Sequence, residues 1–458
     1  MSGFFKEIPE PFEHQAHSTK RQIESERVFD TSDPGTGKTR AALDAFNHRV
    51  QQGLSKKCLV LAPKSILQPA WGNDIKKFTP ELTYSIATAQ NRAKAFETEA
   101  DIYITNHDAV KWLLEHQKVL DEFDTIIIDE LTAYKHHTSQ RSKAIRKLVK
   151  KFKYRVGLTG TPNPNSITDI HHQVLLIDDG ERLGTSFWKF RASVCEPIQV
   201  GPGKEMLQWV DKEGAEEAVA DLIEDITIRN KFEECIDIPS HSVRTVEFNL
   251  TKAHQLKYEE LRLTSILELE SGDISAVHAG TVANKLLQLT SGALYDNDKT
   301  SRVIASERYE LIIELLKQRQ HSVVAFNWHH QKDELTKLAD KAGLTYAVID
   351  GSASDKERIE AVAEFQAGRL NVIFAHPQSA GHGLTLTKGT TTIWASPTYN
   401  AEHYEQFNRR IYRAGQTQKT ETILIAAKNT IDEEVYKKLN GKLEKMTNLL
   451  GLLKDQQE

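Results

Sequence analysis

The stretch Ser32-Asp33-Pro34-Gly35-Thr36-Gly37-Lys38-Thr39 (SDPGTGKT) decides the first part of the fold. It follows an apolar, strand-like run at Arg27–Thr31 and precedes a helix-length segment at Thr39–Gln52. A strand, a glycine-rich loop and a helix in this order form a phosphate-binding P-loop. The glycines let backbone amides curl around phosphate oxygens, and the helix N-terminus adds partial positive charge.

The P-loop predicts the residues that bind the nucleotide. Lys38 has the length to reach the β- and γ-phosphates, and the Thr39 hydroxyl can bind Mg²⁺. The predicted ATP-binding residues of this loop are Gly35, Thr36, Gly37, Lys38 and Thr39. We therefore expect ATP and Mg²⁺ to be required.

Short apolar runs alternate with helical patterns along both halves of the chain. Continuous apolar runs bounded by turn residues are typical of buried parallel strands, and their alternation with helices predicts doubly wound α/β sheets. The predicted strands are Arg27–Thr31, Cys58–Ala62, Asp101–Thr105, Thr125–Asp129, Tyr154–Thr159, Ser322–Asn327, Thr345–Asp350, Asn371–Ala375, Thr391–Ser396 and Glu421–Ala427.

The region between the two series has more charge and clearer helical periods. Glu216–Asp225, Lys252–Glu270 and Ser275–Thr290 each have an amphipathic helical pattern. We predict a first α/β lobe over residues 1–230, a helical linker over 231–300 and a second α/β lobe over 301–458 that ends in a long helix. Within the first lobe, a Gly-Pro-Gly turn between two strand-like pieces predicts a hairpin at about 196–210.

The composition is that of an ordinary globular protein of more than one domain. At about 150 residues per domain, 458 residues predict two or three domains. Lys and Arg number 59 against 64 Asp and Glu, so the net charge is −5, which excludes attachment to nucleic acid through bulk positive charge but not through a local groove. The cysteines at 58, 195 and 235 form no zinc pattern. No signal peptide or membrane span is predicted, so we expect a cytoplasmic protein.

Two more strand ends carry polar residues suited to ATP hydrolysis. The predicted strand Thr125–Asp129 ends in the pair Asp129 and Glu130. A carboxylate pair in this position can hold Mg²⁺ and orient the attacking water, so we assign the metal to Asp129 and the water to Glu130. Leu158-Thr-Gly-Thr-Pro162 ends the next strand with small hydroxyl residues that could sense the phosphate; taken on its own, this segment is better explained as an ordinary turn.

These motifs together resemble the superfamily 2 helicases, and the flanking sequence resembles their Swi/Snf-like branch. Motif Ia of that branch is similar to Leu59-Val-Leu-Ala-Pro63 with Trp71, and motif Ic to Ile104-Thr-Asn-His107. Motif II, the acidic motif, is similar to Asp129-Glu-Leu-Thr-Ala-Tyr-Lys135. Helicase-type P-loops tolerate Ser32 in place of the first glycine. The resemblance implies that Gln15 reads adenine. Thr132 departs from the family pattern, which has histidine there.

The second half carries the remaining motifs of this family. Ser379-Ala-Gly-His-Gly-Leu-Thr385 resembles motif V and places Gly383 near the nucleotide. Gln406-Phe-Asn-Arg-Arg410-Ile-Tyr-Arg413-Ala-Gly-Gln416 resembles motif VI. Arg410 and Arg413 are three residues apart, which predicts one helical face. The resemblance makes them arginines that stabilise the charge developing on the γ-phosphate. The predicted catalytic residues are thus Lys38, Asp129, Glu130, Arg410 and Arg413, and the predicted metal ligands are Thr39 and Asp129.

The family resemblance implies two RecA-like lobes that close on ATP and step along a nucleic-acid strand. A motor of this kind holds phosphates rather than bases, because its grip must not depend on sequence. The DNA-binding residues implied by the motif positions are Pro63, Lys64, Thr105, Asn106, Asn327, Trp328 and Thr385.

The sequence favours an ATP-dependent DNA translocase or helicase, similar to compact phage-encoded members of the family. Forked or branched DNA in replication, recombination or repair, including branch migration, is the expected substrate, and the chain is expected to act as a monomer, in the host cytoplasm if it is phage-encoded. The alternative is a duplex-tracking ATPase that displaces proteins without separating strands. A small-molecule ATPase fits only the P-loop, and a scaffold with a decayed motor is disfavoured by the intact Lys38 and Glu130. An RNA track stays open. The hairpin is either a strand-separating pin or a duplex contact, or it is a plain surface hairpin.

Overall fold

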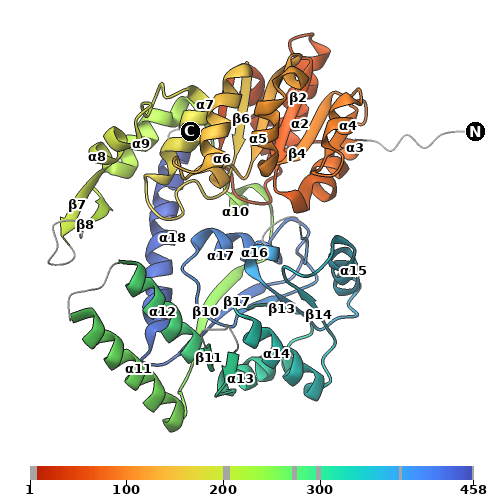
Figure 1. The fold of residues 1–458 in the computed structure, drawn as a ribbon. Helices are drawn as coiled ribbons and strands as arrows, with labels where there is room; N and C mark the ends of the chain where they lie inside the picture. Colours follow the sequence, from red (N-terminus) through yellow and green to blue (C-terminus); the bar gives the residue numbers. More distant parts are fainter. Residues whose placement is uncertain (1–7, 200–206, 271–275, 296–300, 381–383, 456–458) are drawn as a thin grey trace, which may run out of the picture. The chain divides into compact units, whose positions relative to one another are not determined.

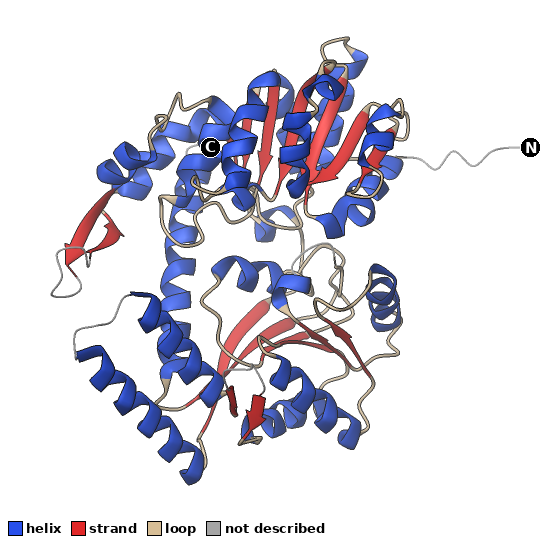
Figure 2. Ribbon diagram, viewed as in Figure 1, coloured by secondary structure: helices blue, strands red, loops and turns tan. Residues whose placement is uncertain are grey.

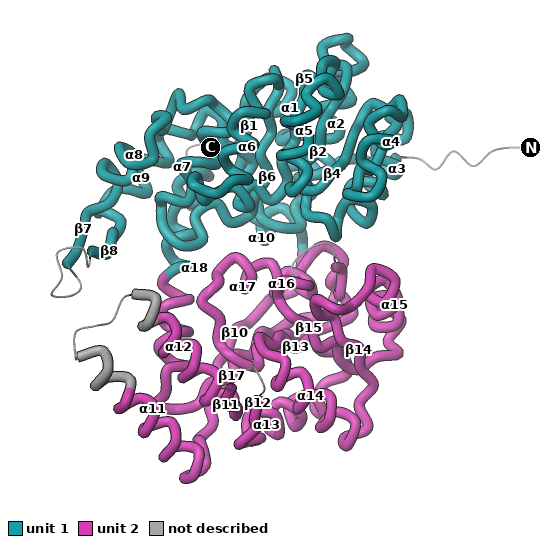
Figure 3. The backbone as a smooth tube through the Cα atoms, viewed as in Figure 1, with its two compact units in different colours: residues 1–237, 442–458 teal, residues 238–441 magenta. Residues whose placement is uncertain are grey.

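The computed structural model describes residues 8–199, 207–270, 276–295, 301–380 and 384–455, and the chain divides into two compact units (Figure 3). Unit 1 contains residues 1–237 and 442–458, and unit 2 contains residues 238–441. This grouping differs from the predicted domain bounds at both ends of the second half. Residues 238–300 group with the second sheet, and residues 442–458 group with the first.

Unit 1 contains a sheet with helices around it (Figures 1 and 2). This sheet is parallel throughout, with the strand order β3-β4-β2-β5-β6-β1-β9. Its inner strands are buried apolar runs, as a sheet covered on both faces requires. The strands are β1 (Arg27–Asp30), β2 (Lys57–Ala62), β3 (Tyr84–Ala87), β4 (Ile102–Asn106), β5 (Phe123–Asp129), β6 (Tyr154–Leu158) and β9 (Thr227–Ile228).

Helices cover both faces of this sheet and bury two apolar layers against it (Figure 2). They are α1 (Glu13–Glu24), α2 (Lys38–Gln51), α3 (Asn73–Phe78), α4 (Arg92–Glu97), α5 (Val110–Glu115), α6 (Gln140–Leu148), α7 (Asp169–Asp178), α8 (Phe187–Val194), α9 (Ala215–Ile223) and α10 (Phe232–Cys235). The predicted hairpin is formed by β7 (Cys195–Gln199) and β8 (Leu207–Asp211), which pair antiparallel; its Gly-Pro-Gly turn lies outside the described residues.

Unit 2 contains a second parallel sheet, with the strand order β10-β17-β16-β13-β15-β14. Its strands are β10 (His241–Phe248), β13 (Ser322–Ala325), β14 (Tyr346–Ile349), β15 (Val372–Ala375), β16 (Thr391–Trp394) and β17 (Thr420–Ala427). Its helices are α11 (Lys252–Glu270), α12 (Ala276–Thr290), α13 (Glu307–Lys317), α14 (His329–Ala342), α15 (Asp355–Gln366), α16 (Pro377–Ala380), α17 (Ala401–Asn408) and the start of α18 (Ile431–Asp455). A short antiparallel pair, β11 (Ala293–Tyr295) and β12 (Ser301–Val303), follows α12.

The predicted fold class, two doubly wound parallel sheets joined by helices, is confirmed. The region predicted as a helical linker, residues 231–300, contains α10, α11 and α12 and also the strand β10, which pairs with β17 along eight residues from His241 to Phe248. No helix in the described ranges combines the length and the hydropathy that a membrane span needs.

A buried ion pair ties together the elements of unit 2. The Arg308 guanidinium, at the start of α13, pairs with the Asp432 carboxylate at the start of α18, and both side chains are almost fully buried. Arg308 also donates to the backbone oxygens of Thr290, Ala395 and Ile425. The N–H groups at Nη1 and Nη2 of Arg308 that Asp432 does not bind are therefore satisfied by backbone oxygens of α12, β17 and the residue after β16. Such additional hydrogen bonds offset the cost of burying an ion pair.

Candidate functional site: the P-loop and the strand ends around it

The P-loop of unit 1 leaves β1 after Asp30 and enters α2 at Lys38. Gly35 and Gly37 have φ angles of 92° and 89°, in the left-handed region that favours glycine. Lys38 Nζ donates to the backbone oxygens of Ser32 at 2.6 Å and Asp33 at 3.1 Å. The loop thus folds around its own lysine, and the amides at the start of α2 are the natural anion site.

Gln15, on α1, lies directly against this loop. Its Nε2 donates to the backbone oxygen of Thr36 at 3.1 Å, and the His14 ring hydrogen-bonds to the same oxygen at 2.7 Å. A Cβ atom at Gly37 would lie 2.1 Å from Gln15 Nε2, so a larger residue there would displace the Gln15 side chain as well as strain the backbone. The structure brings Gln15 to the P-loop; its contact with adenine stays a prediction.

The first residues of the P-loop are held by the segment that follows β9. Arg229 Nη1 lies 2.7 Å from Asp33 Oδ1 and also donates to the backbone oxygen of Thr31 at 2.7 Å. The amide N–H and the side-chain Nδ2 of Asn230 both donate to Ser32 Oγ at 3.0 Å. Ser32, which stands where the motif usually has glycine, therefore uses its hydroxyl to anchor the loop.

The carboxylate pair lies at the end of β5. Trp71 Nε1 donates to Asp129 Oδ2 at 2.9 Å, and the amide N–H of Glu130 donates to Asp129 Oδ1 at 3.0 Å. Burial and the neighbouring Glu130 charge raise the pKa of Asp129 to about 6, against the opposing effects of Trp71 and Lys38. Glu130 has a φ of 52°, an uncommon left-handed conformation for a residue with a side chain, and such outliers concentrate at functional positions.

The loop after β6 lies against the P-loop. A Cβ atom at Gly160 would lie 2.7 Å from Pro34 Cδ, so this glycine permits the close approach of the two loops. The flanking Thr159 and Thr161 are buried, and the Thr161 amide donates to Thr159 Oγ1 at 3.2 Å. The strands β5, β6 and β1 are neighbours in the parallel sheet. The carboxylate pair, the loop at Gly160 and the P-loop, which follow these strands, therefore meet at the carboxyl-end edge of the sheet.

The donor set at this edge fits Mg²⁺ bound together with a triphosphate. Thr39, the second residue of α2, offers a hydroxyl, and Asp129 offers a carboxylate; both are oxygen ligands, which Mg²⁺ prefers. In the described part of the chain, no three His, Cys, Asp or Glu residues gather as a metal site. A magnesium ion here would thus take most of its ligands from the nucleotide and from water, as is usual for nucleotide-bound Mg²⁺.

The predicted arginines lie in unit 2, beyond the end of α17. That helix ends at Asn408, so the prediction that Arg410 and Arg413 share a helical face is wrong: they lie in the turns that follow. Arg410 Nη1 at 3.3 Å and Arg413 Nη1 at 3.1 Å nevertheless converge on the backbone oxygen of Leu384. Leu384 precedes Thr385, so motif VI residues position motif V; Gly383 itself lies outside the described residues.

Three of the predicted DNA contacts in unit 1 lie at strand ends with different accessibility. Lys64 follows β2 and Pro63, and its side chain is exposed. Asn106 ends β4 half-buried, between Arg92 and Asp108. Thr105 is fully buried, and its hydroxyl donates to the backbone oxygen of Ala87 at 2.7 Å. Its side chain is therefore committed to the sheet.

The predicted DNA contacts of unit 2 lie at the ends of β13 and in the loop before β16. Asn327 Nδ2 donates to Ser396 Oγ at 2.9 Å and to the backbone oxygen of Pro397 at 3.0 Å. Trp328 is the half-buried N-cap of α14, and Thr385 is half-buried. The role of these three residues in binding DNA stays a prediction.

Comparison with known proteins identifies the family of this chain. Residues 30–295 match the SNF2-related domain, and residues 307–415 match the helicase conserved C-terminal domain. The first match alone covers more than half of the chain. The chain belongs to the SNF2-related family. It is a Swi/Snf-like member of superfamily 2 and an ATP-dependent enzyme of the helicase class.

Relatives of this SNF2-related protein include a phage protein and bacterial helicases. It is 29% identical to protein p41 of Acyrthosiphon pisum secondary endosymbiont phage 1, over 97% of this chain and 98% of p41. It is 22% identical to the uncharacterized ATP-dependent helicase YqhH of Bacillus subtilis, over 97% and 80% of the two chains. It spans only 38% of a Mycoplasma pneumoniae ATP-dependent helicase, at 24% identity. A solved SWI2/SNF2 ATPase core from Sulfolobus solfataricus in complex with dsDNA has 21% identity and a TM-score of 0.45, over 96% and 93% of the chains.

In this SNF2-related protein, Tyr134 links the segment after the carboxylate pair to other elements of unit 1. It lies two residues after Thr132, the position where the family pattern has histidine. Thr132 is buried in the short helix η5 (Leu131–Tyr134) that follows Glu130. Tyr134, at the end of η5, has its hydroxyl 3.0 Å from His107 Nδ1 and its backbone oxygen 2.6 Å from His172 Nδ1. The segment after the carboxylate pair is therefore joined to the end of β4 and to α7.

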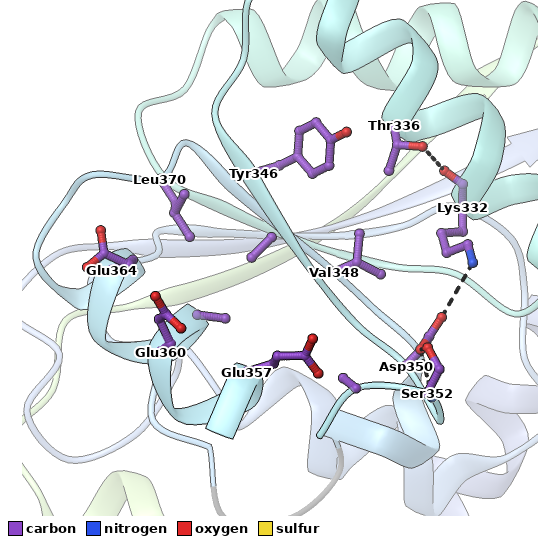
Figure 4. Close-up of a pocket in the computed structure, with 13 residues that line it drawn as sticks. Lys332, Thr336, Tyr346, Val348, Asp350, Ser352, Glu357, Glu360, Glu364 and Leu370 are labelled. Carbon is purple, nitrogen blue, oxygen red and sulfur yellow. Dashed lines mark hydrogen bonds and ion pairs between the residues drawn. The ribbon is translucent and has the colours of Figure 1, made fainter. Parts of the chain in front are cut away.

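A groove of about 650 Å³ lies along β14, the edge strand of the second sheet, between α14 and α15 (Figure 4). Lys332 and Asp350 face each other at one end, with Nζ 3.5 Å from Oδ2, and Ser352 Oγ donates to Asp350 Oδ1 at 2.6 Å. Glu357 and Glu360 line another wall. None of the predicted site residues lines this groove, so it is separate from the nucleotide chemistry.

Sequence reasoning missed the residues that hold the site from outside the motifs. Arg229 and Asn230 follow a strand of two residues, which is too short to be read from periodicity. Trp71 was assigned to motif Ia but not to the carboxylate pair, since nothing in the sequence relates it to Asp129. The one signal available in the sequence was a polar or aromatic residue just after a strand or turn. This pattern is too common to single out residues that hold a site.

Proposed function

We propose that this SNF2-related protein hydrolyses ATP when it binds DNA and uses the reaction to move along the duplex, remodelling or unwinding forked or branched DNA. The observation that supports this most is the meeting of three motifs at one edge of the first sheet. The P-loop, the Asp129–Glu130 pair and the loop at Gly160 end the neighbouring strands β1, β5 and β6.

ATP would bind through the P-loop amides, with Lys38 moving from the loop carbonyls to the phosphates. Thr39 and Asp129 would hold Mg²⁺, whose charge offsets the negative charge of the phosphates. Glu130, the residue after the metal-binding Asp129, would orient the attacking water. Arg410 and Arg413 would stabilise the transferred phosphoryl group; guanidinium groups suit this role because they are planar and always charged.

DNA would be held by phosphate contacts, in keeping with a net charge of −5 and a grip independent of sequence. The exposed Lys64 and the half-buried Asn106 in unit 1, and Trp328 and Thr385 in unit 2, are the proposed contacts. We propose that the protein acts as a monomer. The second candidate function is duplex tracking that displaces bound proteins without separating strands.

Steady-state ATP hydrolysis across a panel of nucleic acids tests the proposal. The panel contains no nucleic acid, single strand, blunt duplex, fork, four-way junction and RNA. We expect DNA to raise turnover at least about tenfold, which is 1.4 kcal/mol of barrier, and Glu130→Gln to abolish turnover while ATP binding persists. Full turnover without nucleic acid would favour a small-molecule ATPase, and no turnover on any substrate would favour a scaffold. Two further assays separate the candidate functions. Opening of a fork would favour strand separation, whereas displacement of a bound protein without fork opening would favour duplex tracking.

A further inference from the structure

In unit 1, α8 and the hairpin β7–β8 form an arm (Figure 1). This arm carries aromatic side chains that the nucleotide site does not use. On α8, Phe190 and Val194 face inward and are buried, whereas Trp188 points outward with 59% of its surface exposed. Leu207, at the outer end of β8, is 44% exposed. Exposed large apolar side chains that lie together mark a binding surface more often than packing.

A cation lies between two of these rings. The Arg191 guanidinium carbon is 4.6 Å from the centre of the Trp188 ring and 3.9 Å from that of Trp209. Within the described residues, Arg191 has no carboxylate within 4 Å, so its charge is not neutralised by an ion pair. Two indoles around a guanidinium form a preorganised, positively charged aromatic surface.

The hairpin continues this surface outward. Pro197 pairs with Trp209, and Gln199 pairs with Leu207, so these four side chains share one face of the hairpin. Glu196 and Ile198 lie on the opposite face, because side chains alternate along a strand. The face that carries Trp209 ends inward at Asp211, whose carboxylate is paired with Lys445 Nζ at 3.0 Å, and from Trp209 outward it carries Pro197, Gln199 and Leu207 without an acidic group.

Basic residues of α6 adjoin the same surface. His137 stacks on Phe187 of α8, with ring centres 3.9 Å apart. The His137 ring also meets Trp188 edge to face, with ring centres 5.7 Å apart, so the segment that leads into α6 contacts the exposed indole. Burial, and then neighbouring basic groups that include Lys143 and Arg191, lower the pKa of His137. Lys143, Arg146 and Lys147 are exposed, and in the described part of the chain none of them has a carboxylate within 4 Å.

We propose that Trp188, Arg191 and Trp209 form a stacking platform for the unpaired nucleotides of a DNA strand, with the exposed lysines and arginine of α6 holding its phosphates. Aromatic faces bind bases without regard to sequence, and adjacent cations bind the backbone. An exposed indole with unneutralised cations beside it fits a nucleic-acid strand better than an apolar protein segment. The platform rests on the proposed function and specifies it, because it selects DNA that has a single-stranded part, such as a fork.

Binding of fluorescent oligonucleotides, measured by anisotropy without ATP, tests this platform. We expect Trp188→Leu, which keeps an apolar side chain but removes the ring, to weaken binding of a mixed-sequence single strand about tenfold. Trp188→Phe should retain most of the affinity, and Lys143→Gln with Arg146→Gln should flatten the salt dependence. Leu54→Ala, at a position 54% exposed in the same unit, is the matched control and should bind as the wild type does.

The possible results separate the proposals. Unchanged single-strand affinity in Trp188→Leu, with a melting temperature equal to that of the wild type, would overturn the platform. An equal loss of affinity for blunt duplex and single strand would also overturn it, and loss of a protein partner alone would assign the surface to protein docking instead. Because no ATP is present, failure of the platform is distinguishable from failure of the proposed ATPase, which Glu130→Gln tests.

Discussion

At the scale of single residues, the P-loop is held in place by side chains that belong to no nucleotide motif. Arg229 and Asn230 bind Asp33 and Ser32, and Gln15 binds the backbone at Thr36. Each of these contacts reaches the loop from a segment distant in sequence. The geometry of the lysine and of the loop amides therefore depends on β9 and α1 as much as on the P-loop itself.

We predict that Arg229→Gln raises the KM for ATP about tenfold or more and lowers the melting temperature. The substitution removes an almost buried ion pair and leaves Asp33 without its charged partner, which costs about 3–5 kcal/mol in comparable buried pairs. The matched control is Arg155→Gln, which breaks another buried arginine's pair, with Asp179, away from the P-loop. It should destabilise the protein but leave the KM of the remaining folded enzyme unchanged; equal KM effects would contradict the assignment.

At the scale of elements, Tyr134 joins the segment after the carboxylate pair to the end of β4. The hydroxyl bond to His107 is the direct link between η5 and the strand end that carries Asn106. Thr132, which replaces the family's histidine, is buried in the same turn. Tyr134 is therefore a candidate for carrying a signal between DNA and ATP in this chain.

We predict that Tyr134→Phe reduces the stimulation of ATP hydrolysis by DNA by about fivefold to tenfold, which corresponds to about 1 kcal/mol of lost coupling through one hydrogen bond. The measurement is the ratio of turnover with saturating duplex to turnover without it. His107→Asn, which keeps a polar partner, should have a smaller effect. An unchanged ratio in Tyr134→Phe would show that this hydrogen bond is structural only.

Two buried histidines of α7 make the stability of unit 1 dependent on pH. Burial lowers the pKa of His171 and of His172 to about 4, from 6.5 in an exposed chain. Above pH 6.5 both are neutral in the folded and unfolded states; below it the unfolded chain binds protons first. Folding stability should therefore fall as the pH drops from about 6.5 to 4, by on the order of 2 kcal/mol per histidine.

His172→Asn tests this pH dependence, because an amide can still donate to the Tyr134 backbone oxygen but does not titrate. We predict that the free energy of unfolding, measured by urea between pH 7 and pH 4.5, falls less steeply in the variant than in the wild type. Identical slopes would contradict a neutral, buried His172.

The extent to which the sequence predicted these elements follows from their burial. The inner strands β2, β5, β6, β13 and β15 are continuous apolar runs and were all predicted. β10 was missed because its residues are mostly exposed or half-buried and alternate with charges, and β9 because it has two residues. The P-loop and the carboxylate pair were found from local spacing, whereas Trp71 and Arg229 meet them only through the fold. The helical face assigned to Arg410 and Arg413 failed because α17 ends before them.

At the scale of the whole molecule, α18 belongs to both units by its packing. Val435 and Leu439 are buried in its first part, which groups with unit 2. Met446, Leu449, Leu450 and Leu453 join the hydrophobic core of unit 1. The C-terminal segment, predicted as part of the second lobe, thus completes the first.

We predict that Leu449→Ala destabilises unit 1 by about 2–5 kcal/mol, the usual cost of removing a buried leucine side chain. Hydrogen exchange followed by mass spectrometry should report faster exchange in peptides of β1, β5 and β6. Thr447→Ala, at an exposed position of the same helix, is the control. Unaltered exchange in those peptides would contradict the packing of this helix in unit 1.

The proposed movement along DNA is tested most directly by displacement of a third strand from a triplex at the end of a linear duplex. We predict that the wild-type protein with ATP and Mg²⁺ releases the third strand, with a delay that grows with the length of duplex to be crossed, and that Glu130→Gln does not. ATP hydrolysis stimulated by DNA with no release at any length would contradict translocation, and it would leave a DNA-activated ATPase that does not move.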